Sequence, residues 1–358
     1  MSVAIVSGSC GLVGAETVKL LAGQGLDVVG IDNDMRQVFF GPDASTAWQA
    51  DALARHCPGY THVASDIRDV SAMHKLFAAH GRNVVAIVHC AAQPSHDWAV
   101  RDPMLDFSVN ATGTLTLLEA TRTHAPDAAF IFTSTNKVYG DRPNRLPLVE
   151  QATRFELAVE HPWAAHGIPE EMPVDACLHS IFGASKLAAD VMVQEYGRYF
   201  GLRTGCFRGG CLTGPGHSGA QLHGFLAYLV RCAVEGRPYS VFGHHGKQVR
   251  DNIHAADLAR AFWCFIQDPA PGEVFNIGGG RHSNCSVVEA IGMVEALEGR
   301  PMAWSHVDEP RIGDHQWWIS DVRKFRARYP QWDYAYDIQA IIADIHDGLR
   351  QRLRFAAE

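Results

Sequence analysis

Three glycines and an aspartate near the N-terminus have the spacing of a phosphate-binding loop. Gly8, Gly11 and Gly14 follow the apolar run VAIVS, and a helical pattern follows them. Glycines between a strand and a helix let backbone amides approach a pyrophosphate, which then lies at the positive end of the helix dipole. Asp32 ends the next apolar run, where a carboxylate can accept hydrogen bonds from an adenosine ribose. The pattern predicts a dinucleotide site.

Asp32 also selects between two dinucleotides. A 2′-phosphate beside its carboxylate would meet a like charge at a cost on the order of a few kcal/mol, whereas a free ribose hydroxyl would not. We therefore expect NAD and not NADP. Asp66-Ile67 ends a further strand and is suited to the adenine edge, with a turn residue as the alternative for Asp66.

Four further blocks of small or polar residues interrupt the hydrophobic pattern. They are HCAAQPSHDW (89–98), VNATGT (109–114), TSTNKVYGD (133–141) and FGASK (182–186). Each lies at the carboxyl end of an expected strand or on an adjoining helix. Because open parallel sheets bind ligands at that edge, we expect these blocks to converge on one site.

The elements that must position these blocks are short apolar strands alternating with helices. Apolar runs without alternation are typical of strands buried on both faces of a parallel sheet. The pattern predicts an α/β fold with a doubly wound parallel sheet, a Rossmann domain. The expected strands cover 3–8, 26–32, 83–92 and 128–135, with another near 203–208, and the first helix covers Ala15–Gln24.

The second half of the chain has a looser pattern. We assign residues 1–208 to the NAD-binding domain, with 247–280 returning to it, and 209–358 to a smaller mixed α/β substrate lobe that includes a helix near 224–235 and a strand near 240–243. The proline-rich stretch between Gly140 and Phe182 is expected to be a functional lid, with a surface excursion as the alternative.

Composition excludes several classes of protein. A formal net charge of −8 argues against general nucleic-acid or anionic-membrane binding. Nine scattered cysteines without C-x-x-C spacing, and dispersed histidines, indicate neither disulfides nor a metal site. With no signal peptide or membrane span in the pattern, we expect a cytoplasmic protein.

Together with RDNIHAADLA (250–259), the blocks resemble those of the extended short-chain dehydrogenase/reductase family, whose NAD enzymes epimerise or dehydrate sugar nucleotides. The branch of CDP-paratose 2-epimerase-like (CDP-tyvelose epimerase-like) proteins is the most similar, through VEQATR (149–154), GIPEE (167–171) and HSIFGASK (179–186). The resemblance implies that cofactor contacts come from Gly8, Gly11, Leu12, Val13, Gly14, Asp32, Asn33, Asp66, Ile67, Ala91, Ala92, Gln93, Asn110, Thr133 and Lys186.

The resemblance also assigns catalytic positions. The hydroxyl that bonds the reacting sugar maps to Thr135, and the lysine that holds the nicotinamide ribose maps to Lys186. The family's catalytic tyrosine falls on Phe182, which can neither accept nor donate a proton. Three explanations stay open: a tyrosine-to-phenylalanine variant made to trap a complex, a natural member with another proton carrier, or lost redox activity. Ile181 and the pair Gly209-Gly210 favour natural divergence.

Lys137 is the expected alternative proton carrier, because its family position faces the carbons beside the transient ketone. A lysine whose pKa is lowered by burial could move a proton there; a structural lysine is the alternative. Arg250 and Arg311 match positions that bind the diphosphate, and each could instead form a salt bridge with Asp251 or Asp314. The expected substrate contacts are Gln93, Ser95, His96, Thr135, Asn136, Lys137, Arg208, Arg250 and Arg311.

We therefore expect an NAD-dependent epimerase of a CDP-, UDP- or GDP-hexose that acts through a transient keto sugar. A dehydratase of the same fold is the alternative, although positions 136 and 137 lack the acid pair of 4,6-dehydratases. A disabled protein that only binds NAD or a sugar nucleotide is the competing class. The helices near 106–122 and 184–200 match those that form a dimer interface in the family, which implies a homodimer.

Overall fold

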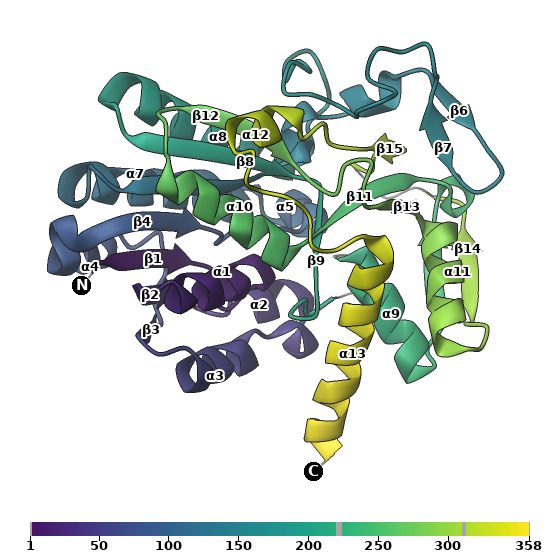
Figure 1. Ribbon diagram of the computed structural model, residues 1–358, viewed down its shortest axis with the longest axis horizontal. Coiled ribbons are helices and arrows are strands. Elements are labelled where there is room, and N and C mark those ends of the chain that lie inside the picture. The colour runs from purple at the N-terminus through teal and green to yellow at the C-terminus, as the bar shows by residue number, and fades with distance from the viewer. Residues whose placement is uncertain (1, 220–223, 310–312, 358) are drawn as a thin grey trace.

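A seven-stranded, all-parallel sheet forms the centre of the computed structural model, which describes residues 2–219, 224–309 and 313–357 (Figure 1). The strand order is β12-β8-β5-β4-β1-β2-β3. The order reverses between β1 and β4, so the carboxyl ends of those strands border a crevice suited to a ligand. The bounds are β1 Val3–Ser7, β2 Asp27–Ile31, β3 Tyr60–Val63, β4 Val84–His89, β5 Ala129–Thr135, β8 Arg203–Gly209 and β12 Glu273–Ile277.

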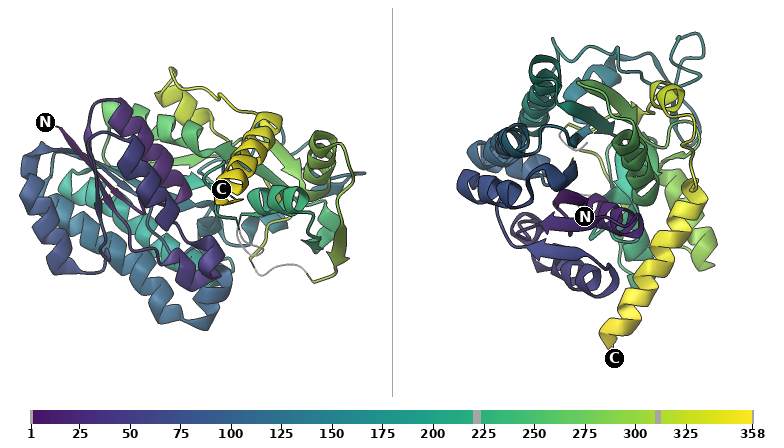
Figure 2. Two further views of the ribbon diagram at one scale, coloured as in Figure 1. Left: turned by 90° about the horizontal axis from the view of Figure 1, so that it is seen from below. Right: turned by 60° about the vertical axis from the view of Figure 1, so that its left-hand side comes forward.

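Helices cover both faces of this sheet (Figure 2). One apolar core joins the sheet to α1 (Leu12–Gly23), α3 (Ala47–His56), α10 (Ala255–Gln267) and α12 (Arg323–Arg328). A second core joins the other face to α4 (Val70–His80), α7 (Gly113–His124) and α8 (Ser180–Phe200). Because side chains on both faces of the strands are buried, the strands carry no polar alternation. The predicted α/β doubly wound fold is confirmed.

Several further helical segments are short. They are α2 (Arg36–Phe40), α5 (His96–Arg101), α6 (Pro103–Phe107) and the 3₁₀ turns 42–44, 81–83, 136–139, 142–145 and 244–246. A π-helical turn, Ser108–Thr112, joins α6 to α7. Such turns often occur near functional sites.

A smaller part built on a third core lies beside the carboxyl ends of the strands. It contains α9 (Phe225–Glu235), α11 (Val287–Glu298) and α13 (Ile338–Ala357), with β10 (Tyr239–Phe242) paired to β14 (Trp304–Val307). A four-stranded sheet of β9 (Cys211–Thr213), β11 (Val249–His254), β13 (Asn284–Ser286) and β15 (Trp317–Trp318) lies between the two parts (Figure 1). Within 247–280, α10 and β12 pack with the large sheet, whereas β11 belongs to this smaller sheet.

The stretch between Gly140 and Phe182 is not a lid, contrary to our expectation. It forms a hairpin of β6 (Leu148–Glu150) and β7 (Phe155–Leu157) and an irregular segment that packs in a fourth core with Trp317 and Trp318. None of residues 140–181, all of which the structure describes, lines the main cavity. The stretch instead packs against Val138 and Tyr139 in the turn that follows β5.

The described helices include none that is long and apolar enough to cross a membrane.

Candidate active site

One cavity of about 760 Å³ runs from the glycine loop to the smaller part of the molecule. Its walls come from the carboxyl ends of β1, β2, β4, β5 and β8, from the start of α8, and from β10 and β11. The four polar blocks therefore meet at one edge of the sheet, as predicted from their positions at strand ends.

The glycine loop has the shape of a cradle for a pyrophosphate. Gly8 has a φ of +66°, and a Cβ there would lie 2.6 Å from the backbone nitrogen of Ala91. A Cβ on Gly14 would lie 2.0 Å from the carbonyl oxygen of Gly8. Helix α1 begins just after Gly11 without a side-chain cap, so its first amides can donate to phosphate oxygens. Side chains at Gly8 and Gly14 would clash with this backbone, so the glycines permit the tight strand-to-helix turn that presents amides to a pyrophosphate, and the loop fits NAD.

Asp32 lies at the adenosine end of the cavity. Its carboxylate accepts from the backbone N–H of Cys10 at 3.0 Å and of Asp34 at 2.8 Å. Burial is the largest influence on its pKa and raises it, while these two donors oppose the rise. Asp66 also lines the cavity, but its carboxylate is held by Arg68 at 2.6 Å, which lowers its pKa. Asn33 donates to Asp66 at 3.2 Å.

A set of contacts that sequence reasoning missed joins the adenosine end to the smaller part. The buried side chain of Gln49 donates to the carbonyl of Cys10 at 3.0 Å and to the carbonyl of Gly216 at 3.1 Å. Arg36 donates to the carbonyl of Ser218 at 2.6 Å. No local pattern marks Gln49 or Arg36, because their partners lie far away in the sequence.

The reacting end of the cavity contains Thr135 and two lysines. Thr135 ends β5, and its hydroxyl accepts from the backbone N–H of Lys137 at 3.2 Å. The Lys137 ammonium donates to the carbonyl of Gly313 at 2.9 Å. Lys186 is buried and donates to the carbonyl of Thr133 at 2.9 Å; burial lowers its pKa to about 8. The structure brings these residues together with Asn136 on one wall.

Phe182 lies on this wall, one turn before Lys186 on α8, and is 7% exposed. The next residue, Gly183, allows a close approach, because a Cβ there would lie 2.9 Å from the carbonyl oxygen of Lys137. The ring of His96 packs edge-on against the Phe182 ring, with centroids 4.9 Å apart. Ser180 Oγ lies 3.2 Å from His96 Nδ1.

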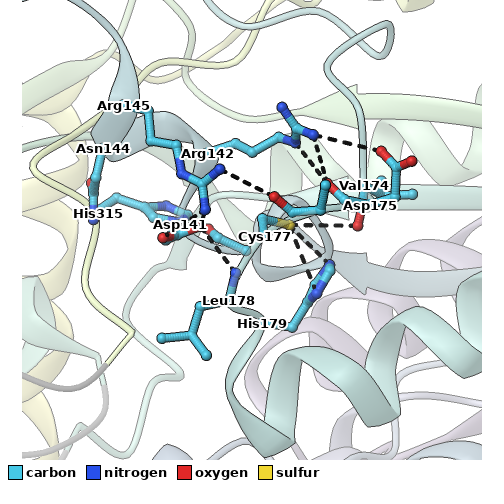
Figure 3. Close-up of polar contacts among 12 residues, drawn as sticks. Asp141, Arg142, Asn144, Arg145, Val174, Asp175, Cys177, Leu178, His179 and His315 are labelled. Carbon is cyan, nitrogen blue, oxygen red and sulfur yellow. Dashed lines mark hydrogen bonds and ion pairs between the residues drawn. The ribbon is translucent and has the colours of Figure 1, made fainter.

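The segment that leads into α8 is fixed by residues that follow β5 (Figure 3). Asp141 accepts from the backbone N–H of Leu178 at 3.0 Å. Arg142 donates to the carbonyl of Asp175 at 2.7 Å, and Arg145 donates to the carbonyl of Ala176 at 3.1 Å. His179 contacts the carbonyl of Val138 at 2.8 Å. These bonds hold the start of α8 in a fixed position relative to Thr135 and Lys137.

Three residues that we expected to contact the ligand lie outside the cavity and hold the loop after β4 instead. Gln93 donates to Asp106 at 2.7 Å, Asn110 donates to the carbonyl of Gln93 at 3.1 Å, and Ser95 caps α5 by accepting from Trp98 at 3.2 Å. All three are buried, and none lines the cavity. The expectation of direct ligand contact is wrong for them, because their polar atoms are used to hold the loop after β4.

Arg208 is also misassigned as a substrate contact. It is 5% exposed, forms an ion pair with Asp190 at 2.8 Å and donates to the hydroxyl of Tyr139 at 2.9 Å. It does not line the cavity, because its guanidinium points into this buried network.

Arg250 does line the cavity, and it is paired with Asp314. Burial opposes ionisation of Asp314, but Arg250 and Lys137 outweigh it and lower the pKa to about 2. Arg311 lies outside the described residues. The far end of the cavity, also missed from sequence, is an apolar slot whose walls include Phe225, Leu226, Tyr239, Val241 and Val307.

No group of three or more His, Cys, Asp or Glu side chains in the described parts of the chain is arranged to hold a metal ion.

Comparison with known proteins agrees with this geometry. CDP-paratose 2-epimerase of Salmonella typhi is 29% identical over 327 residues, which cover 89% of this chain and 91% of that protein. dTDP-glucose 4,6-dehydratase 1 of Escherichia coli K12 is 28% identical over 305 residues, covering 80% and 75% of the two chains. The fold matches UDP-glucuronic acid 4-epimerase of Bacillus cereus with a TM-score of 0.78 at 22% identity, covering 98% of this chain and 99% of that one.

A family model described as "NAD dependent epimerase/dehydratase family" matches residues 4–278. This match spans the glycine loop, Thr135, Lys137, Phe182 and Lys186. The resemblance stated from the sequence is therefore confirmed, and NAD is the cofactor. The chain belongs to the NAD dependent epimerase/dehydratase family.

Proposed function

We propose that this protein is an NAD-dependent nucleoside-diphosphate-sugar epimerase that acts through a transient keto sugar. The observation that carries the proposal is the single cavity that joins the dinucleotide cradle at Gly8 to the lysines at 137 and 186 and then to the apolar slot at Tyr239. A nucleotide sugar has three matching parts: a sugar for the lysines, a diphosphate for Arg250 and a base for the slot.

NAD supplies a nicotinamide ring that takes up and returns a hydride. Lys186, expected at the nicotinamide ribose, is held by the carbonyl of Thr133. The Thr135 hydroxyl is placed to bond the reacting sugar hydroxyl. The Lys137 ammonium can stabilise negative charge on the sugar oxygen or move a proton at a neighbouring carbon. For epimerisation at the oxidised carbon itself, the keto sugar must rotate in the site and present its opposite face before the hydride returns.

Epimerisation is favoured over 4,6-dehydration by the residues after Thr135. Elimination of water beside a ketone needs an acid and a base at the sugar. Here Asn136 and Lys137 occupy the positions where the family's dehydratases carry an acid pair, and Lys137 is engaged with Gly313. The CDP-paratose 2-epimerase of Salmonella typhi is similar over most of the chain.

The test is incubation of the purified, NAD-loaded protein with UDP-, CDP-, dTDP- and GDP-hexoses in deuterated water. The expected product is an epimer of one of them. Deuterium on carbon would indicate proton transfer at a neighbouring carbon. Its absence would indicate that the keto sugar rotates and receives the hydride on its opposite face. A product lighter by one water would favour the dehydratase instead, and no product from any sugar nucleotide would overturn the proposal.

We also propose that the protein is a homodimer formed through α7 and α8. Apolar side chains that are at least one-third exposed gather on and next to these helices: Phe107, Leu115, Ile181, Val191 and Met192. Contiguous exposed apolar surface on a globular protein is typical of an interface. Light scattering should give twice the chain mass, and Val191→Asp with Met192→Asp should give the monomer.

A cytoplasmic location is part of the same proposal. All nine cysteines are free, which is the state expected in a reducing compartment. Localisation of a tagged full-length chain tests it.

A further inference from the structure

We propose that His96, oriented by Ser180, is the proton carrier that replaces the tyrosine hydroxyl missing at Phe182. The inference rests on the proposed function. Removal of a hydride from a sugar carbon leaves a carbonyl only if the hydroxyl on that carbon loses its proton, and the phenyl ring of Phe182 cannot take it. Another group beside the Phe182 ring must therefore accept the proton of the sugar hydroxyl.

His96 is an ionisable side chain in contact with the Phe182 ring. Its ring meets the Phe182 ring edge-on at 4.9 Å, and both residues line the cavity with Thr135 and Lys137. An imidazole is suited to the task, because its unperturbed pKa is close to neutral and it can both accept and return a proton near pH 7.

The two lysines of the site are less suited to accept the proton. The Lys137 ammonium donates to Gly313 and lies close enough to Asp314 to lower the pKa of that carboxyl. These interactions favour the charged form, which has no lone pair. Lys186 is buried and donates to the carbonyl of Thr133. Both are better placed as hydrogen-bond donors and positive charges.

Ser180 holds the imidazole in place. Its Oγ lies 3.2 Å from His96 Nδ1 and accepts from the backbone N–H of Gly183 at 3.2 Å. Ser180 has a φ of 58°, a left-handed conformation that is strained for a residue with a side chain and often occurs at functional sites. When Nδ1–H donates to Oγ, the lone pair of Nε2 is the one that accepts a proton.

The proposed step balances in both directions. The O–H bond of the sugar hydroxyl breaks and its proton forms an N–H bond on His96, while bound NAD would accept the hydride that leaves the same carbon. The imidazolium returns the proton when the hydride returns to the sugar. Gly313 packs against the His96 ring, since a Cβ on Gly313 would lie 2.9 Å from His96 Cε1, and the carbonyl of Gly313 accepts from Lys137. Asp97 and Lys186 line the same cavity.

The test compares His96→Gln with the wild type on UDP-glucose, CDP-glucose, dTDP-glucose and GDP-mannose. We expect turnover to fall about 10²–10⁴-fold, with the content of bound NAD unchanged. Adding Phe182→Tyr to His96→Gln should restore turnover at least tenfold, because a phenol would again be present beside Lys186. Ser180→Ala should cause a smaller loss. His56→Gln, at the exposed end of α3, is the matched control and should behave as the wild type.

A spectroscopic readout separates proton transfer from a structural role. The ring ¹⁵N signals of His96, assigned by their absence from His96→Gln, should shift when the converted sugar nucleotide is added, and in Ser180→Ala they should show a changed balance of the two tautomers. Wild-type turnover in His96→Gln, or a loss that Phe182→Tyr leaves unrepaired while NAD and sugar nucleotide still bind, would overturn the inference alone. No conversion of any sugar nucleotide by the wild type would overturn the proposed function as well.

Discussion

Gln49 and Gly216 are 167 residues apart in the chain and are joined by a hydrogen bond of 3.1 Å. The same side-chain nitrogen donates to the carbonyl of Cys10 within the glycine loop. One buried amide therefore ties the cofactor cradle to the smaller part of the molecule. Any motion that separates the two parts at the adenosine end must break the Gln49–Gly216 bond or the Gln49–Cys10 bond. This geometry is suited to an enzyme that takes a hydride from its substrate and returns it without exchanging its cofactor.

Gln49→Ala should speed the release of NAD. The change removes the Gln49 donor from the carbonyls of Cys10, which is buried, and Gly216, which is partly buried, at a cost on the order of 1–3 kcal/mol, so we expect the dissociation rate to rise about tenfold or more. The measurement is displacement of bound NAD by a fluorescent NAD analogue in stopped flow. Gln24→Ala, on the exposed surface just after α1, is the matched control, and an equal rate in the two variants would contradict the role of Gln49.

Phe182→Tyr tests whether the site is disabled. If His96 already carries the proton, a tyrosine hydroxyl supplies nothing essential, and turnover of the accepted sugar nucleotide should change by less than about tenfold. A disabled or trapped enzyme would instead gain about 10²–10⁴-fold. The NAD content of both proteins, read from absorbance after denaturation, verifies that the cradle is intact.

The glycine loop and the parallel strands could be predicted because each depends on neighbours in the sequence. Gly8, Gly11 and Gly14 are required within one strand-to-helix turn, and buried strands such as β1 are apolar on both faces. The positions of Thr135, Lys137 and Lys186 on one wall could be predicted for the same reason: they follow strand ends or lie on the adjoining helix.

The contacts of Gln49 and Ser180 could not be predicted, because each depends on a partner from another part of the fold. Arg208 shows how strand position alone misleads. It lies near the carboxyl end of β8, where ligands bind, but all of β8 except its first residue is buried, and Arg208 is turned toward Asp190. The stretch between Gly140 and Phe182 was wrongly predicted for another reason. Its length is typical of a lid, but its apolar side chains pack in the core that contains Trp317 and Trp318.

Arg208→Met tests the buried ion pair. Removing one partner leaves the Asp190 carboxylate buried without its countercharge, and we expect a loss of about 3–5 kcal/mol in the free energy of unfolding. Urea unfolding followed by fluorescence measures it. Arg203→Met, at the exposed start of the same strand, should cost far less. Asp190→Leu added to Arg208→Met should recover part of the loss; an unchanged stability in Arg208→Met would contradict the assignment.

Asp251 makes the stability of the protein depend on pH. The carboxyl is fully buried, accepts from the backbone N–H groups of Gly280 and Ser320, and has one oxygen without a hydrogen-bond partner among the described residues. Burial raises its pKa from 3.8 to about 6. Between these values the unfolded chain is ionised while the folded protein holds the proton, so the folded state binds more protons and loses stability as the pH rises through this window.

The expected change is a fall of about 2–3 kcal/mol in this group's contribution between pH 4 and pH 7, because one pKa unit corresponds to about 1.4 kcal/mol. Asp251→Asn removes the titration. The wild type should therefore be more stable relative to Asp251→Asn at pH 4.5 than at pH 7, as measured by urea unfolding of both proteins in matched buffers. A stability difference between the two proteins that stays constant over this range would show that the Asp251 carboxyl has the same pKa folded and unfolded.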